Sequence, residues 1–166
     1  MAVLIERLAA HHVRAGFDCG ESVLNDFLQR QAGQLQRRGF GKTYVALADD
    51  GLAIVGYVSV SAGQIATRAL PEGLKLPRYP APMLRIGRLA VDARQQGTGI
   101  GQGLLAFALR LALEFSQQVG LYAVLVEAKD NKARAFYTRL GFIETVDDSL
   151  CLYLPIATLA KTMAAP

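Results

Sequence analysis

The 166-residue sequence has few cysteines and no long apolar run, and both absences narrow its class. Cys19 and Cys151 lie far apart and lack the C-x-x-C spacing of metal or disulfide frameworks, so we expect reduced thiols, with Cys151 in the core. No apolar run reaches the roughly 18 residues needed to span a bilayer. Glu6 and Arg7 interrupt the apolar start before a secretory signal can form. The sequence therefore predicts a cytosolic protein without a membrane segment and without a metal site.

The stretch Arg94–Gly103 reads RQQGTGIGQG, with a glycine at every second position from Gly97 onward. It lies between an apolar run and a helical pattern. Glycine lets successive backbone N–H groups turn inward, and the following helix adds unpaired N–H groups and the positive end of its dipole. Such a segment is typical of an anion cradle, so we expect a phosphate-bearing ligand. A purely structural glycine turn is the alternative.

Two common phosphate-binding loops do not fit the spacing of these glycines. No Lys-Ser or Lys-Thr pair follows them, which argues against a nucleoside triphosphate loop. The dinucleotide fingerprint G-x-G-x-x-G fails because its sixth position is Gln102 when read from Gly97 and Leu104 when read from Gly99. The pattern that fits is R-x-x-G-x-G, in which the arginine is Arg94.

A second motif lies further along the chain, where residues 130–142 read DNKARAFYTRLGF. Together the two motifs resemble the acetyl-CoA loop and the N-x-x-A-x-x-F-Y-x-x-x-G-F segment of GNAT-type N-acetyltransferases. Asp130 stands at the asparagine position of that segment, and Asn131 follows one place later. The other positions match at Ala133, Phe136, Tyr137, Gly141 and Phe142.

The order of apolar patterns predicts an α/β (α+β) chain with a mixed sheet. The GNAT resemblance implies a mostly antiparallel sheet with two central splayed parallel strands, flanked by helices, in one domain over residues 1–166. Four of the six prolines lie in residues 70–82, which should be irregular. We expect helices over 17–38, 100–117 and the second motif, and strands over 3–8, 43–48, 52–65, the run ending at Val91, 121–128 and 150–154.

The resemblance also implies which residues hold acetyl-CoA and which transfer the proton. Backbone groups of Leu89, Ala90 and Val91 would contact pantetheine, and an N–H near Val91 would polarise the thioester carbonyl. Tyr137 would act as general acid toward the departing thiolate, the alternative being an aromatic that only packs. The remaining coenzyme contacts are expected at Arg94, Gln95, Gln96, Gly97, Thr98, Gly99, Ile100, Gly101, Gln102, Asn131 and Phe136.

A general base is less evident in the sequence. Glu127 could face the cleft between splayed strands, although a carboxylate near a strand end is as often a surface group. The adjacent His11 and His12 are interpreted as solvated loop residues. An α-amino group, with a pKa of about 8, is roughly a tenth neutral at pH 7, whereas a lysine amine is far less so. An α-amine acceptor would therefore need little help from a base.

Three further segments, residues 17–28, 76–92 and 152–159, resemble the GNAT toxins of bacterial toxin-antitoxin modules. That resemblance implies acetylation of the α-amino group of aminoacyl-tRNA, which blocks translation. It also implies a small antitoxin with a ribbon-helix-helix half as partner, and a homodimer is possible. An acetyltransferase for a small amine or a protein N-terminus stays open, as does a non-catalytic coenzyme-sensing or antitoxin-binding module.

Basic residues are unevenly distributed in this chain of net charge +4. The segment from Arg68 to Arg94 alone holds six basic and two acidic residues, an excess equal to the net charge. Coenzyme phosphates, a solvated surface or an RNA partner could each account for it. We expect RNA contacts at Arg78, Arg85 and Arg88, with internal ion pairs, above all for Arg88, as the alternative.

Overall fold

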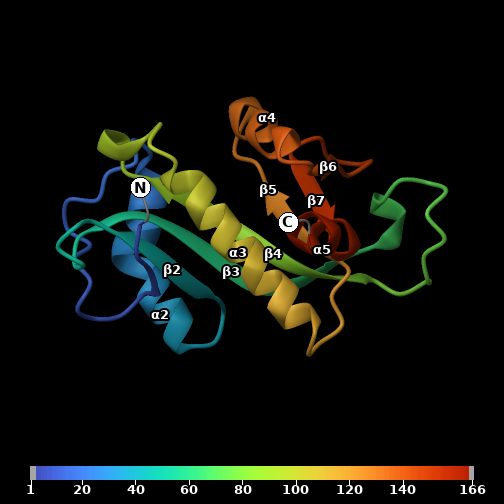
Figure 1. The fold of residues 1–166 in the computed structure, drawn as a ribbon, viewed down its shortest axis with the longest axis horizontal. Coiled ribbons are helices and arrows are strands. Elements are labelled where there is room, and N and C mark those ends of the chain that lie inside the picture. The colour runs from blue at the N-terminus through green and yellow to red at the C-terminus, as the bar shows by residue number, and fades with distance from the viewer. Residues whose placement is uncertain (1–2, 165–166) are drawn as a thin grey trace. The chain divides into compact units, whose positions relative to one another are not determined.

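Residues 3–164 are described by a computed structural model, and their strands form one mixed sheet (Figure 1). The strand order is β1-β2-β3-β4-β5-β7-β6. β4 and β5 run parallel, whereas the pairs β1–β2, β2–β3, β5–β7 and β6–β7 are antiparallel. This confirms the predicted mixed, mostly antiparallel sheet. The strands are β1 Ile5–Arg7, β2 Lys42–Leu47, β3 Ile54–Ile65, β4 Ala81–Val91, β5 Ala123–Glu127, β6 Ile143–Glu144 and β7 Cys151–Pro155.

The chain comprises two compact units. The first unit comprises Met1–Ser61 and Gly87–Ala108, and the second comprises Ala62–Ile86 and Leu109–Pro166. Within residues 3–164, no helix is both long enough and apolar enough to cross a membrane.

The first unit buries one face of its N-terminal helical segment. Phe27 and Leu28 from that segment pack with Val45 of β2 and Tyr57 of β3 in a single apolar cluster. The expected helical face is corrected at Val23, which is 72% exposed. The helix is not uniform either, because a π-helical stretch changes the turn in its middle, and a 3.6-residue period does not anticipate that change. Its parts are α1 Ser22–Asp26, η1 Phe27–Gln31 and α2 Ala32–Arg37.

The second unit packs around β5, which pairs with β4 on one side and β7 on the other. Met83, Leu125 and Tyr153 belong to its buried cluster. Cys151 only borders this cluster and is half-buried, so its predicted core position is corrected; its thiol is in no disulfide. Two short 3₁₀ turns and three further helices complete the structure: η2 Thr67–Ala69, η3 Ala93–Gln95, α3 Ile100–Ser116, α4 Asn131–Arg139 and α5 Ile156–Ala164.

Helix α5 and strand β6 were absent from the predicted order. The apolar run 150–154 was expected to close the chain, yet Pro155 ends β7 and α5 begins at the next residue. Proline is favoured at the first position of a helix, whereas Pro155 stands one residue before it and marks the boundary between β7 and α5. Strand β6 has only two residues, and its pairing with β7 depends on a neighbour that lies later in the chain.

The ladder between β4 and β5 ends before β4 does. Paired residues run from Met83 to Ile86 on β4, whereas the strand itself continues to Val91. Among the described residues, Leu89–Val91 therefore have no partner on β5. This is the backbone segment that was predicted to contact pantetheine.

Candidate active site

The loop between η3 and α3 exposes a row of unpaired backbone donors. Gly97 and Gly99 have φ values of +82° and +91°, a region that side-chain-bearing residues rarely adopt, which explains the glycines at these two positions. The backbone N–H groups of residues 97–102 donate no hydrogen bond to another described residue. The last three of these belong to the first turn of α3, where the helix dipole is positive. The loop is therefore suited to hold an anion such as a pyrophosphate.

Buried Asp92 anchors this loop to the segment before α1. Its carboxylate accepts hydrogen bonds from the Arg94 side chain at Nε and Nη2, both at 2.9 Å, and from the backbone N–H of Asp18 at 3.1 Å. Arg94 Nη2 also donates to the carbonyl of Gly16 at 3.1 Å. The structure thus assigns the Arg94 guanidinium to support of the loop. Gln96 adds to this support through bonds to the carbonyls of Cys19 and Val91.

Replacing Asp92 with Asn should lower the free energy of unfolding by about 2 kcal/mol at neutral pH, because charge-assisted bonds are lost. Hydrogen bonding from Arg94 lowers the pKa of Asp92 from 3.8 to about 2. The carboxylate therefore stabilises the fold fully above about pH 4, and this contribution is lost as the pH falls through about 2. Urea unfolding at several pH values should show the gap between wild type and Asp92→Asn closing over that range. Asp26→Asn, at an exposed position, is the control, and a gap independent of pH would contradict the assignment.

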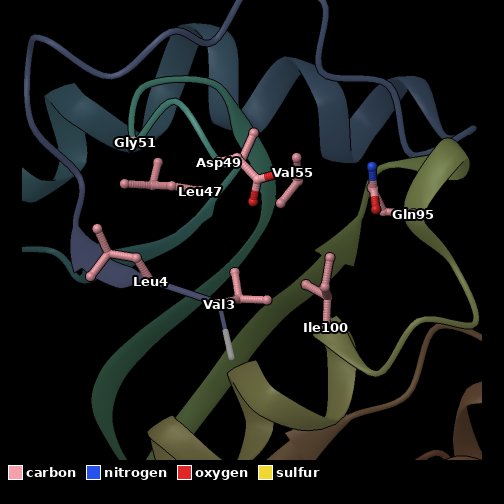
Figure 2. A pocket seen from close by; sticks show the side chains of 9 residues that line it. Val3, Leu4, Leu47, Asp49, Gly51, Val55, Gln95 and Ile100 are labelled. Carbon is pink, nitrogen blue, oxygen red and sulfur yellow. The ribbon is translucent and has the colours of Figure 1, made fainter. Parts of the chain in front are cut away.

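A cavity of about 330 Å³ lies beside the loop in the first unit. Its lining surface is about equally polar and apolar, and Figure 2 shows the Asp49 carboxylate among the side chains around it. An acidic group repels phosphates, so the anion site is assigned to the loop backbone and not to this cavity. The lining residues are Val3, Leu4, Leu47, Ala48, Asp49, Gly51, Val55, Gln95 and Ile100.

The second predicted motif forms α4 and its two ends. The Asp130 carboxylate caps the helix by accepting the backbone N–H of Ala133 at 2.8 Å, a role that asparagine also performs, so the departure from the family pattern keeps the cap. Asn131 is the first, exposed residue of the helix. Gly141 has φ +98° just after the helix, the position where glycine is favoured as a C-terminal cap. Most of the motif is therefore explained by the local helix.

Tyr137 is buried in the second unit, at 6% exposure. Its ring meets Phe142 and half-buried Phe136 edge-to-face, with centroid distances of 5.5 and 5.3 Å. The Tyr137 hydroxyl makes no hydrogen bond to a described residue. Every fully buried side-chain oxygen among the described residues has a hydrogen-bond partner. The Tyr137 hydroxyl is therefore not fully buried and reaches solvent. Burial raises its pKa to about 12. Tyr137 is thus a protonated phenol with an unengaged hydroxyl, as a proton donor requires.

The predicted base candidate Glu127 is bound to another predicted site residue. Arg85 Nη2 lies 2.9 Å from both carboxylate oxygens of Glu127, and the two side chains are 44% and 52% exposed. The alternative foreseen for Arg85, an internal ion pair, is therefore present. The pair occupies the carboxylate and partly neutralises the charge that Arg85 would offer to RNA.

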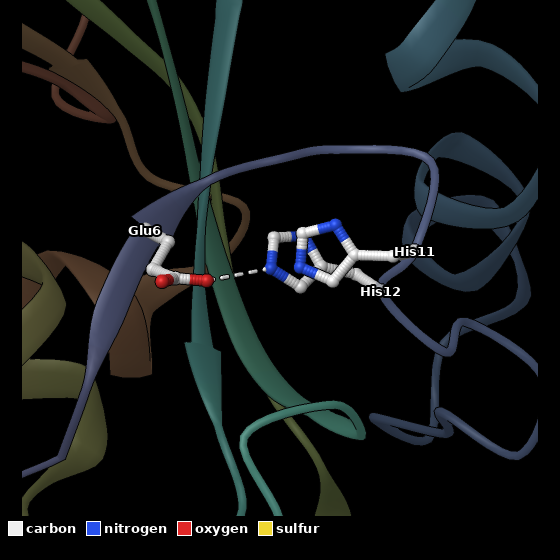
Figure 3. A group of neighbouring side chains, drawn as sticks. All are labelled: Glu6, His11 and His12. Carbon is white, nitrogen blue, oxygen red and sulfur yellow. Dashed lines mark hydrogen bonds and ion pairs between the residues drawn. The ribbon is translucent and has the colours of Figure 1, made fainter.

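His12 is not the solvated residue that the sequence indicated. It is 4% exposed, its Nδ1 accepts the backbone N–H of Ala9 at 3.0 Å, and its Nε2 lies 2.9 Å from Glu6 Oε1 (Figure 3). The bond from Ala9 requires an unprotonated Nδ1, so Nε2 carries the proton that Glu6 accepts. Ligand-type atoms of Glu6, His11 and His12 lie within 4.8 Å of one another, yet both His12 nitrogens are engaged. The group holds the loop after β1 in place.

The two other arginines predicted to contact RNA differ in their surroundings. Arg78 is exposed in the proline-rich segment. Within residues 3–164, half-buried Arg88 has no ion pair with an acidic side chain, which the alternative supposed. Its guanidinium carbon lies 4.0 Å from the centroid of the Phe27 ring. Phe27 in turn stacks on Tyr57, at 5.9 Å. Arg88 keeps its N–H donors available because a cation–π contact uses only the face of the guanidinium.

The mixed sheet, the anion-binding glycine loop and the protonated tyrosine together fit a group-transfer enzyme whose donor bears phosphate. The family model described as an acetyltransferase (GNAT) domain matches residues 39–144. The chain therefore belongs to the GNAT acetyltransferase family, and it is an N-acetyltransferase that uses acetyl-CoA.

Similar proteins are toxins of this family. A tRNA-acetylating toxin of Mycobacterium tuberculosis (strain ATCC 25618 / H37Rv) is 33% identical over 140 residues, which cover 83% of this chain and 82% of the relative. AtaT complexed with acetyl-methionyl-tRNAfMet superposes with a TM-score of 0.91 at 29% identity, covering 98% of this chain and 100% of that one. A tyrosine-to-phenylalanine mutant of AtaT, bound to the C-terminus of the antitoxin AtaR and acetyl-CoA, gives 0.85 at 28% identity, covering 98% and 99%.

Proposed function

We propose that this chain is a toxin that transfers the acetyl group of acetyl-CoA to the α-amino group of aminoacyl-tRNA and so stops translation. The observation that supports acetyl-CoA as the acetyl donor is the row of unpaired N–H groups over residues 97–102. The acceptor half is supported by the similarity to a tRNA-acetylating toxin and to AtaT complexed with acetyl-methionyl-tRNAfMet.

In the proposed reaction, the protein holds the donor by its backbone. The N–H groups of residues 97–102 bind the pyrophosphate of the coenzyme. Backbone groups of Leu89–Val91, which have no described partner on β5, bind the pantetheine arm. An N–H near Val91 polarises the carbonyl. Further contacts are assigned to the side chains of Asn131 and Phe136. Bound acetyl-CoA supplies an activated acyl group as a thioester.

Tyr137 supplies the proton that the transfer needs. As the acceptor nitrogen bonds to the carbonyl carbon and the carbon–sulfur bond breaks, the Tyr137 hydroxyl protonates the departing sulfur. The proton lost by the amine passes to water and restores the phenol. No side-chain base is assigned, because an α-amine of pKa about 8 is sufficiently neutral near pH 7. The ion pair with Arg85 gives Glu127 a structural role.

The proposal extends to partners and location. The structure of mutant AtaT with a segment of AtaR supports an antitoxin partner. We propose that this antitoxin has a ribbon-helix-helix DNA-binding half. We also propose that the toxin itself forms a homodimer. Residues 1–166 are proposed to form one GNAT domain, because the family match from 39 to 144 includes residues of both compact units. Aminoacyl-tRNA and acetyl-CoA as substrates imply a cytoplasmic protein.

The direct test incubates the purified protein with radiolabelled acetyl-CoA and total aminoacyl-tRNA. We expect label on the amino acid, recovered as an N-acetylaminoacyl group after mild alkaline release from tRNA. Deacylated tRNA is the control and should take up no label. Label on free amines or on protein N-termini, with none on aminoacyl-tRNA, would assign the enzyme to those acceptors instead.

A further inference from the structure

Two guanidinium groups converge over one glycine of α2. A Cβ atom placed on Gly33 would lie 3.4 Å from Nη1 of Arg37 and 3.8 Å from Nη2 of Arg14. The two cations therefore meet beside a backbone position that has no side chain. A glycine within a helix is less favourable than an alanine, because it loses more backbone freedom on folding. Here it leaves the space that the two guanidinium groups use.

No carboxylate compensates this pair of charges. Within residues 3–164, neither Arg14 nor Arg37 forms an ion pair with an acidic side chain. Half-buried Arg14 is held in place by donating from Nη2 to the carbonyl of Ala9 at 3.3 Å. Burial, and after it the charge of Arg37, lowers the pKa of Arg14. Because arginine stays protonated in proteins, two like charges are held together with donors left over.

The surrounding segment has the charge and the aromatic exposure of a nucleic-acid surface. Residues 27–42 contain four basic residues and no acidic one. Arg38 lies 5.4 Å from the centroid of the Phe40 ring, and Phe40 is 66% exposed. An exposed aromatic ring beside arginines is typical of surfaces that contact nucleotides.

We propose that Arg14 and Arg37 form a phosphate-binding site for the sugar-phosphate backbone of the RNA acceptor. A phosphodiester accepts bonds from both guanidinium groups, and its negative charge removes the repulsion between them. The inference rests on the proposed function in naming aminoacyl-tRNA as the RNA. The site lies outside the acetyl-CoA loop, so it sets the affinity for the acceptor and not the rate of acetyl transfer.

The test measures binding of an unacylated acceptor-stem minihelix by fluorescence anisotropy at several salt concentrations. Arg37→Ala should weaken binding about fivefold at low salt and reduce the slope of log affinity against log salt by about one. Gly33→Leu keeps both charges but fills the space where they meet, so it should weaken binding similarly. A leucine also favours the helix, so thermal stability should be maintained or rise. With aminoacyl-tRNA, both variants should raise KM and leave kcat unchanged.

Arg110→Ala, which removes one charge from an exposed position on α3, is the matched control. Equal losses in Arg37→Ala and Arg110→Ala, or full binding by Gly33→Leu, would overturn the site. Arg37→Ala could instead leave minihelix binding unchanged and weaken the binding of a glutamate-rich peptide. That result would overturn the RNA site and show that the two arginines bind an acidic protein segment. Because the minihelix carries no amino acid, failure of acetyl transfer in the wild type would contradict the proposed function alone.

Discussion

Tyr137→Phe should lower kcat for acetyl transfer to aminoacyl-tRNA by about a hundredfold or more while leaving acetyl-CoA affinity unchanged. The loss follows from removal of the only proposed proton donor to the departing sulfur, and general acid catalysis typically contributes about 10²- to 10⁴-fold. Affinity is retained because the ring, which makes the contacts with Phe136 and Phe142, is still present. Steady-state kinetics and calorimetry with acetyl-CoA measure the two quantities.

Tyr153→Phe is the matched control for that experiment. Tyr153 is also a buried tyrosine of the second unit, and burial likewise raises its pKa, but its hydroxyl has no proposed role. Its variant should retain wild-type turnover. Burial raises the pKa of Tyr137 to about 12, so its phenol stays protonated near pH 10, where an ordinary tyrosine ionises. We therefore expect kcat to show no fall near pH 10 from ionisation of Tyr137. Full turnover by Tyr137→Phe would remove the residue from the mechanism.

Gly99→Val should weaken acetyl-CoA binding by about a hundredfold. At φ +91° a β-branched residue is strained, so the loop is expected to change its backbone and turn the donor N–H groups of residues 97–102 away. The valine methyl groups would also stand in the open space where the pyrophosphate is proposed to lie. Calorimetry with acetyl-CoA measures the loss, and thermal unfolding measures any change in stability.

Gly103→Ala tests whether any added side chain in the glycine run has this effect. Gly103 lies within α3, without a positive φ, and a Cβ there meets no atom within 4 Å. The alanine should leave affinity unchanged and stabilise the protein by up to about 1 kcal/mol, because alanine favours the helix. Wild-type affinity in Gly99→Val would contradict the assignment of the loop as the pyrophosphate site.

Features that depend on nearby residues were predictable. The spacing of Gly97 and Gly99 predicted an anion loop, and the structure gives both glycines positive φ. Asp130 and Gly141 define the two ends of α4 through bonds that span three or four residues. The hairpin between β2 and β3 was placed to within two residues. Backbone preferences of this kind act over one turn of chain, so a single sequence contains the information.

Features that depend on distant residues were not predictable. Arg88 lies over Phe27, which is 61 positions earlier in the sequence. Arg85 pairs with Glu127 because β4 and β5 run side by side. No periodicity in the sequence encodes such pairs, since they arise only when strands and helices pack.

The sequence by itself determined the fold class, and it predicted the loop for the phosphate-bearing donor and Tyr137 as the proton donor, because local backbone preferences and short motifs carry this information. The tertiary structure decided what individual charges do. In the structure, the Arg94 side chain donates to Asp92, and Glu127 forms an ion pair with Arg85. The guanidinium groups of Arg14 and Arg37 both lie beside Gly33. The physical reason is that a charge acts through its neighbours in space, and those neighbours are fixed by packing between segments far apart in the chain.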